Sequence, residues 1–520
     1  MAENTAPEAD NSAAQQIAAG YATEGAALEL GCVVIDGTVD PTARVRIPFA
    51  TLNRHGLVAG ATGTGKTKTL QGLAEQLSNA GVPVLLADVK GDLSGLARPG
   101  TPNPKVEQRA KDTGDDWTPT AFPVEFLSLG GKSSAVPIRA TLTQFGPILL
   151  SKVLSLNDTQ ESTLGLIFHW ADQQHLPLLD TKDLRAVIQH LTSDEGKADI
   201  KGIGGVSPAT AGVILRALVN LEAAGGEDFF GEPEFELSDL IRLVDGKGVI
   251  TLLELSDQAA NPRLFSTFLM WLLAELYQEL PEAGDLDKPK LVFFFDEAHL
   301  LFTDASKAFL ERIEQTVKLI RSKGIGVFFC TQLPTDVPNA VLSQLGARIQ
   351  HALRAFTPED QTALKKTVKT YPNTKNYDME EALTSLGTGE AIVTVLSETG
   401  APTPVAWSRM RAPRSLMAAI GGDAVTATAK ASPLFAKYGT TVDRESAYEK
   451  LTSKIAEASA PPPPAADAPP PPPREERHGR EQPGMVAEVL GSPMVKSFLR
   501  SAGTALGREI TRGLFGTRRR

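Results

Sequence analysis

Cysteine is scarce in this sequence, which has only Cys32 and Cys330 among its 520 residues. Two cysteines cannot build a disulfide framework, and this favours a reducing, cytosolic compartment. Long apolar runs are missing too, because no stretch approaches the roughly 18 consecutive apolar residues of a membrane-spanning helix. The N-terminus, MAENTAPEADNSAAQQ, is acidic and polar and lacks the basic-then-apolar order of a secretory signal. We therefore expect a cytoplasmic protein.

An excess of basic residues is also absent, since the formal net charge is −10. This balance argues against a uniformly basic nucleic-acid binder. A local basic pore or tail stays open, because steering depends on how charge is distributed rather than on its total. Hydrophobic residues make up 42% and charged residues 22%, which is typical of a globular protein. The length predicts one large elaborated domain or two to three smaller ones.

Apolar runs of strand length alternate with segments of helical periodicity. Residues 66–80 have helical spacing with Leu70, Leu73 and Leu77 on one face, and the run VPVLLADV at 82–89 indicates a strand buried on both faces. This order predicts an α/β fold with a doubly wound, mostly parallel sheet. Further strands are expected at 248–255, 290–298 and 324–332, with helices at 262–280 and 305–323.

The composition changes along the chain and divides it into segments. From 142 to 245 the periodicity is helical with almost no strand signal, so we expect a helical insertion within the core. A proline-rich stretch cannot bury a core, and the basic end of the chain has an apolar stripe at helical spacing. We expect a disordered leader (1–25), core (26–141), insertion (142–245), core (246–455), linker (456–484) and basic amphipathic C-terminal helix (485–520).

The strongest motif is a glycine-rich loop that fits G-x-x-x-x-G-K-[ST] at every required position, between a strand and a helix. Glycines allow the backbone to wrap a phosphate and point its N–H groups inward. We expect Lys66 to neutralise the β- and γ-phosphates of ATP and the Thr67 hydroxyl to bind Mg²⁺. The loop consists of Gly60, Ala61, Thr62, Gly63, Thr64, Gly65, Lys66 and Thr67.

Two later strands end in polar residues that suit ATP hydrolysis. In KLVFFFDEAHLLF, Asp296 would hold the Mg²⁺ shell and Glu297 would orient or deprotonate the attacking water. In GIGVFFCTQ, Gln332 would sense the γ-phosphate. The alternative interpretations are a solvated acidic pair and a polar strand cap. The phosphate-binding loop upstream favours the catalytic interpretation of the acidic pair.

Taken together, the loop, the DEAH ending, the Thr-Gln strand end and the segment DVKGD at 88–92 resemble the HerA/FtsK superfamily of motor ATPases. Within it, residues from about 30 to 455 are similar to the bacterial HerA-like (YjgR-like) group. The resemblance implies a RecA-like, additional-strand P-loop NTPase fold, with the Gln332 strand between the loop strand and the Asp296 strand. It also implies homo-hexameric rings with ATP sites at subunit interfaces.

The resemblance further implies that arginines complete the site. Arg54 matches an arginine that acts within its own subunit, and Arg321 matches a finger that reaches the neighbour's site. Arg348 and Arg354 are further candidates. Ordinary surface arginines at element ends are the alternative for all four.

The load of such a motor is open at this stage. A DNA translocase or helicase-like motor is the first hypothesis, because Lys and Arg in a pore would contact phosphates. A motor that moves or remodels protein is the second, and an ATP-gated recruitment switch is the third. The basic helix at 485–520 would fit a partner protein, a membrane surface or a nucleic acid.

Overall fold

The structure is a computed structural model, and the residues that it describes all belong to one unit, Met1–Ser459. The predicted linker beyond residue 458 and the predicted helix at 485–520 lie outside the described residues. The described ranges are 12–130, 134–223, 225–255, 262–284, 286–302 and 307–458.

Twelve strands of the described residues form one sheet, in the order β2-β1-β14-β13-β12-β3-β11-β10-β4-β9-β5-β6. Neighbours pair in parallel from β12 to β6, and antiparallel pairs extend the sheet from β12 to β2. The prediction of a mostly parallel α/β sheet is confirmed, and β11 lies between β3 and β10 as the family resemblance implied. The strands are Ala27–Ile35 (β1), Thr38–Pro48 (β2), Gly56–Ala59 (β3), Val84–Asp88 (β4), Val124–Leu129 (β5), Val136–Ile138 (β6), Ile250–Glu254 (β9), Leu291–Phe295 (β10), Ile325–Thr331 (β11), Ala347–Gln350 (β12), Glu390–Thr394 (β13) and Ala406–Met410 (β14).

The central strands are mostly apolar because helices cover both faces of the sheet. In β10, Phe293 and Phe295 pack into a core shared with helices α9 and α11, while Phe294 packs on the other face with helix α2. This alternation follows from the two-residue period of a strand. The helices of this part are Lys66–Asn79 (α2), Pro104–Thr113 (α3), Pro262–Glu279 (α9), His299–Phe302 (α10), Lys307–Ile320 (α11), Asn339–Leu342 (α12), Pro358–Val368 (α13) and Met379–Ser385 (α14).

Five helices occupy the stretch where the sequence predicts a helical insertion. Side chains at their N-termini explain where two of them begin: Asn157 with Gln160, and Asp180 with Asp183, form reciprocal capping boxes. A small hairpin of Leu243–Val244 (β7) and Lys247–Gly248 (β8) leads back to the sheet. Among the helices that the structure describes, none is long and apolar enough to span a bilayer. The five helices are Leu142–Val153 (α4), Asp158–Gln173 (α5), Thr181–Thr192 (α6), Asp194–Asp199 (α7) and Pro208–Ala223 (α8).

The expected leader is ordered where the structure describes it. Helix α1 (Ala13–Ala19) starts after Ser12, whose side chain accepts a hydrogen bond from a backbone N–H of its first turn. Ile17 and Tyr21 are buried, and the Tyr21 hydroxyl donates to the carbonyl of Val393 (2.8 Å). The prediction of disorder therefore fails for residues 12–25, because two buried side chains in a polar segment hold it against the sheet.

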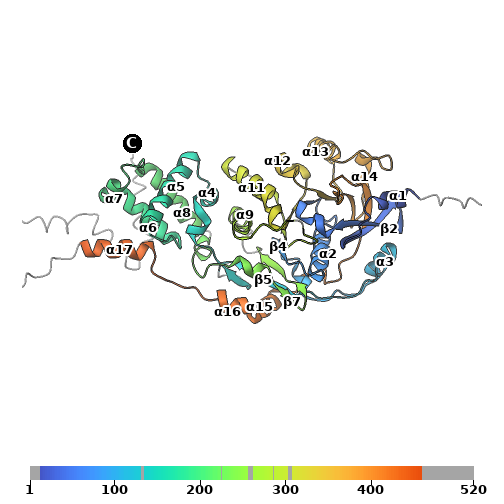
Figure 1. Cartoon of the computed structure of the whole chain (residues 1–520), viewed down its shortest axis with the longest axis horizontal. Helices are drawn as coiled ribbons and strands as arrows, with labels where there is room; N and C mark the ends of the chain where they lie inside the picture. The colour runs from blue at the N-terminus through green and yellow to red at the C-terminus, as the bar shows by residue number, and fades with distance from the viewer. Residues whose placement is uncertain are drawn as a thin grey trace, which may run out of the picture. The chain divides into compact units, whose positions relative to one another are not determined.

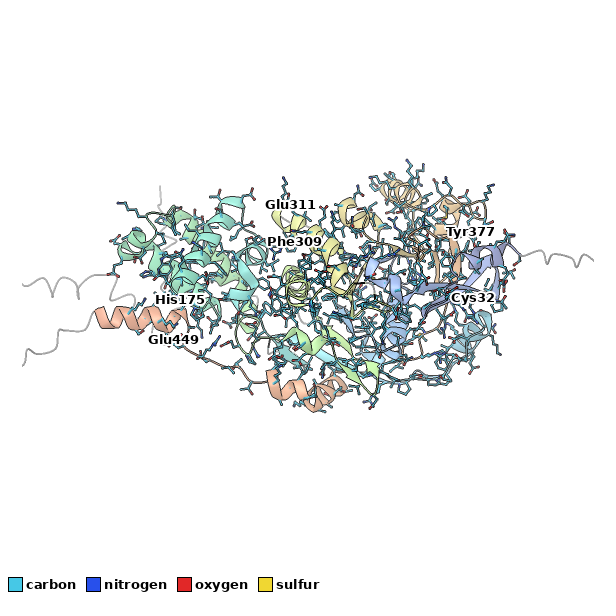
Figure 2. The ribbon with its side chains drawn as sticks, in the orientation of Figure 1. Cys32, His175, Phe309, Glu311, Tyr377 and Glu449 are labelled. Carbon is cyan, nitrogen blue, oxygen red and sulfur yellow. The ribbon has the colours of Figure 1, made fainter. Side chains whose placement is uncertain are left out.

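The chain after β14 was expected to belong to the core, but residues 411–458 form an extended segment that we call the strap. It contains helices α15 (Gly422–Ala431), α16 (Pro433–Tyr438) and α17 (Ala447–Ala458), and α17 packs against α6 of the inserted helices (Figure 1). Figure 2 shows Glu449 of α17 close to His175, and the neighbouring Lys450 donates to the His175 carbonyl (3.1 Å). The strap thus contacts both the sheet part and the inserted helices.

Candidate functional site

The glycine-rich loop joins β3 to α2 with a backbone that requires glycine. Gly60, Gly63 and Gly65 have φ angles of 149°, 81° and 118°. A side chain at Gly60 would place its Cβ 2.6 Å from the Cβ of His351, and one at Gly65 would lie 3.1 Å from Gly389. The motif glycines are therefore needed both for backbone conformation and for space.

Neighbouring strand ends hold the loop in place. The Gly60 N–H points at the carbonyls of Thr331 (3.3 Å) and Gln332 (3.2 Å), and the Ala61 N–H donates to the Ala352 carbonyl (2.8 Å). The loop is thus fixed to the ends of β11 and β12. On its inner side, the Lys66 ammonium donates to the carbonyls of Gly60 (2.6 Å) and Ala61 (3.2 Å). This places a positive charge at the N-terminus of α2, where an anion is favoured.

The acidic pair follows β10 at the same edge of the sheet as the loop. Parallel register sets Ala59 beside Thr331 and Phe295 beside Phe329, so Gly60, Asp296 and Gln332 follow neighbouring strand ends. Burial raises the pKa of the Asp296 carboxyl, and the charge of Glu297 raises it further. Carboxylate oxygens of this kind suit Mg²⁺.

Cys330 marks how closely the two motifs approach. Burial raises the pKa of its thiol, and the charges of Asp296 and Lys66 both act on it. A single buried side chain of β11 therefore lies within electrostatic reach of both halves of the site.

Glu297 has an unusual backbone and a defined cationic partner. Its φ of +49° lies in the left-handed region, which is costly for a residue with a side chain. The Lys90 ammonium lies 3.1 Å from its Oε1, and His299 Nδ1 lies 3.4 Å from its Oε2. Burial acts to lower the pKa of Lys90, but the contact with Glu297 and the charges of Asp296 and Asp92 together outweigh burial, and the pKa is raised.

Asp88 organises the loop that presents Lys90. Its carboxylate accepts hydrogen bonds from the backbone N–H groups of Gly91 (2.7 Å) and Leu93 (2.9 Å). Burial raises the pKa of Asp88 to about 6. Through Lys90, the 88–92 loop faces the acidic pair of its own chain.

Gln332 is exposed at the tip of β11 and lines a surface hollow with His299, Phe302, Leu333 and Asp336. Asp336 fixes this strand end, because it accepts hydrogen bonds from the Thr331 hydroxyl (2.7 Å) and the Leu333 N–H (3.0 Å). The Gln332 side chain therefore lies at the rim of the site, and hydrogen bonds to Asp336 fix the backbone beside it.

His351 supports the loop from behind and was missed by the sequence interpretation. Its Nδ1 is 2.8 Å from the Glu390 carbonyl and its Nε2 is 2.9 Å from the Thr69 hydroxyl. Burial lowers its pKa to about 4, so the ring is neutral at physiological pH. Its position at the end of the strand RIQ is the signal that could have identified it.

The structure does not bring Arg54 or Arg321 to the loop of its own subunit. Arg54 precedes β3 and Arg321 precedes β11, so both lie at the amino edge of the parallel strands, opposite the loop. The Arg54 guanidinium donates to the carbonyls of Ser397 (3.1 Å) and Glu398 (3.3 Å). A role of Arg54 in its own subunit's site, as the resemblance implied, does not fit this placement.

Arg354 is the candidate arginine that contacts the loop. Its Nη2 donates to the carbonyl of Thr62 (3.2 Å), and its side chain is exposed. Arg348 instead donates to the Thr370 carbonyl (2.9 Å), away from the loop. The two arginines of the same strand region therefore differ in what they contact.

Comparison with known proteins gives matches over most of the chain. The family model described as "Helicase HerA-like C-terminal" matches residues 35–520. The "DNA double-strand break repair helicase HerA" of Sulfurisphaera tokodaii is 22% identical over 372 residues, which cover 70% of this chain and 66% of that protein. The match thus spans just under two thirds of the relative's own length.

Two solved structures of the plasmid coupling protein TrwB share the fold. The unbound form of TrwBdeltaN70 has a TM-score of 0.50 at 16% identity and covers 78% of this chain and 94% of its own. The complex with a non-hydrolysable ATP analogue has a TM-score of 0.50 at 15% identity, covering 76% and 98%. The likeness indicates a common RecA-like α/β architecture.

Proposed function

The chain belongs to the helicase HerA-like C-terminal family of P-loop ATPases, and from this premise we propose that it is a cytoplasmic, hexameric ring motor that hydrolyses Mg-ATP to move DNA. The observation that carries the proposal is the meeting of the glycine-rich loop and the acidic pair at one edge of the sheet. Ligands of open α/β sheets bind at this carboxyl edge.

Lys66 and the N-terminus of α2 supply the positive field for the phosphates of ATP. Thr67 and Asp296 would hold Mg²⁺, which when bound neutralises charge on the β- and γ-phosphates. Magnesium binding takes one or two protein carboxylates and leaves the other positions to phosphates and water.

Glu297 orients the attacking water and accepts its proton, and Gln332 at the neighbouring strand tip senses the γ-phosphate. The ion pair with Lys90 holds the Glu297 carboxylate in place at 3.1 Å. Because the Glu297 backbone is strained, the surrounding contacts must maintain its orientation.

Two arginines complete the proposed site from different subunits. Arg354 contacts the loop within its own subunit, and Arg321 is assigned to the neighbour's site because it cannot reach its own. Arginines in these positions counter the charge that develops on the γ-phosphate. For Arg54 we propose a structural role in holding the turn at 397–398.

The DNA part of the proposal is tested by ATPase measurements with single- and double-stranded DNA. A motor that contacts six to ten phosphates should lose about 10³–10⁵ in DNA affinity between 50 and 200 mM salt, and its stimulated rate should fall accordingly. Lys66→Ala serves as the control without turnover. If neither DNA binds or changes the rate at low salt, DNA is not the load, although the ATPase assignment would stand.

A motor that acts on protein is the second candidate, favoured by the net charge of −10. An acidic chain repels nucleic acid unless basic residues are concentrated at the contact surface. Stimulation of ATP hydrolysis by a protein substrate, with no response to DNA, would select this candidate.

A further inference from the structure

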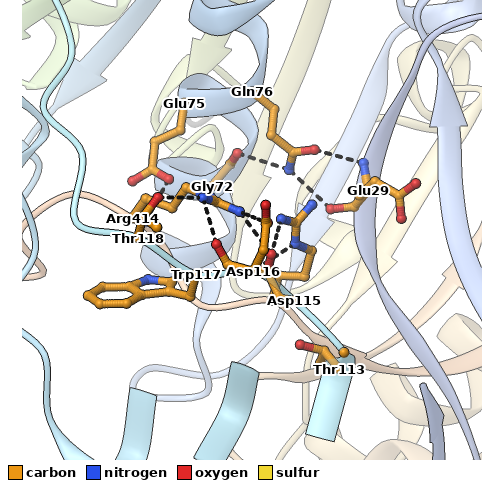
Figure 3. A network of polar contacts seen from close by, with 12 residues as sticks. Glu29, Gly72, Glu75, Gln76, Thr113, Asp115, Asp116, Trp117, Thr118 and Arg414 are labelled. Carbon is orange, nitrogen blue, oxygen red and sulfur yellow. Dashed lines mark hydrogen bonds and ion pairs between the residues drawn. The ribbon is translucent and has the colours of Figure 1, made fainter. Parts of the chain in front are cut away.

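The strap begins against the helix that follows the phosphate loop. The buried carboxylate of Glu75 accepts a hydrogen bond from the Arg414 N–H (2.8 Å; Figure 3). It also accepts hydrogen bonds from the Ser415 N–H (2.9 Å) and the Ser415 hydroxyl (2.5 Å). Lys68 (3.1 Å) and Gln71 (3.0 Å) donate to strap carbonyls from the same helix face. Removing these donors would leave a buried carboxylate without partners, so this end of the strap is firmly bound.

A second element from the site contacts the same part of the strap. The Ser94 hydroxyl oxygen accepts the N–H of Ile420 (3.1 Å), and the Gly100 N–H donates to the Arg414 carbonyl (3.0 Å). An added Cβ at Gly95 would lie 2.0 Å from the carbonyl oxygen of Leu416, so the two segments leave no space between them. This stretch continues directly from the 88–92 loop, whose Lys90 contacts Glu297.

The other end of the strap is bound to the inserted helices and the segment that follows them. The Tyr438 hydroxyl donates to Asp239 Oδ2 (2.6 Å) and accepts the Glu236 N–H (3.0 Å). Further along, Asp183 of α6 accepts the Tyr448 N–H (2.8 Å). One continuous segment is therefore held at one end by two elements of the nucleotide site and at the other by the helical part.

We propose that the strap couples the nucleotide state of α2 and the 88–100 segment to the position of the inserted helices. This inference rests on nucleotide binding at residues 60–67, as proposed above. Coupling between two sites is reciprocal: if nucleotide changes how the strap's far end binds, loosening that end must change nucleotide affinity by the same factor. Such factors are typically about 5- to 150-fold.

The experiment uses the full chain and two tyrosines of the strap. Tyr438→Phe removes the hydroxyl that contacts Asp239, whereas Tyr448→Phe is the matched control, since its hydroxyl makes no hydrogen bond within the described residues. Affinity for a fluorescent ATP analogue is measured for each variant. Hydrogen exchange of residues 433–458 is measured with and without that analogue.

We expect the ATP analogue to change the hydrogen-exchange rates of α16 and α17 in the wild type. Tyr438→Phe should shift the dissociation constant of the analogue at least about fivefold, whereas Tyr448→Phe should leave it unchanged. Glu75→Gln, at the near end, should abolish the exchange response while nucleotide still binds. Nucleotide binding without any exchange response in α16 and α17, or equal affinities for both tyrosine variants and the wild type, would overturn the coupling and make the strap a static brace. A wild type that binds no nucleotide would overturn the proposed function as well.

Discussion

The position of Arg321 makes a quantitative prediction about shared ATP sites. Arg321 lies before β11, whereas the phosphate loop contacts the far end of that strand. The seven residues of β11 span about 23 Å at about 3.3 Å per residue. A side chain cannot cover that distance, so the proposal assigns Arg321 to the site of a neighbouring subunit rather than to its own.

Rings assembled from two variants give an expected fraction of complete ATP sites. Lys66→Ala subunits lack their own phosphate-binding lysine, and Arg321→Ala subunits lack the arginine offered to a neighbour, so either variant alone should be almost inactive. In a randomly mixed 1:1 ring, a site is complete when an Arg321→Ala subunit meets a Lys66→Ala neighbour. This occurs at about one half times one half, or about a quarter, of the sites.

The assay is steady-state phosphate release from subunits that are mixed before assembly. A mixture of Lys66→Ala with Glu297→Gln is the control, because both residues act in the same subunit and no site is then complete. Recovery of about a quarter of wild-type turnover in the first mixture, and none in the control, is expected. Recovery in neither mixture, or equal recovery in both, would refute the assignment of Arg321 to the neighbour's site.

Three further predictions concern the site and the fold. Glu297→Gln should bind ATP normally but lower turnover by about 10²–10⁴-fold, and unchanged phosphate release would contradict its role. Gly56→Ala would place a Cβ 2.2 Å from the Phe328 ring and should lower the free energy of unfolding by about 1–3 kcal/mol. Gly72→Ala, a helical position with no atom within 4 Å of the added Cβ, should raise it by about 0.5–1 kcal/mol, so equal effects in denaturant melts would contradict the packing argument. Because the pKa of His351 falls from 6.5 to about 4 on folding, its neutral ring stabilises the fold fully above about pH 6.5 and this contribution is lost as the pH falls toward 4. Between pH 7 and 5.5, the free energy of unfolding of His351→Gln should therefore fall by about 1 kcal/mol less than that of the wild type. Identical decreases in urea titrations would show that His351 does not titrate in this way.

Features that depend on neighbouring residues could be predicted from the sequence. The glycine-rich loop, the helix after it and the apolar strands before Asp296 and Gln332 follow from local periodicity and from backbone angles that only glycine adopts easily. Because parallel strands end at one edge, these motifs also predict the general position of the site.

Features that depend on which distant residues meet could not be predicted in this way. Arg54 and Arg321 stand at the expected places in the sequence, but only strand direction shows that they lie opposite their own loop. The contact of Arg354 with the loop, the support from His351 and the Lys90–Glu297 ion pair all join segments that are far apart in the chain.

The sequence by itself determined the chemistry of the phosphate loop and the fold class. The loop follows from a short motif, and the fold class follows from the two-residue period of strands and the nearly four-residue period of helices. The tertiary structure alone decided which arginine reaches the loop, why residues 12–25 are ordered and where the strap lies. These outcomes follow from packing between remote segments, whose free energy comes from buried contacts rather than from any local preference.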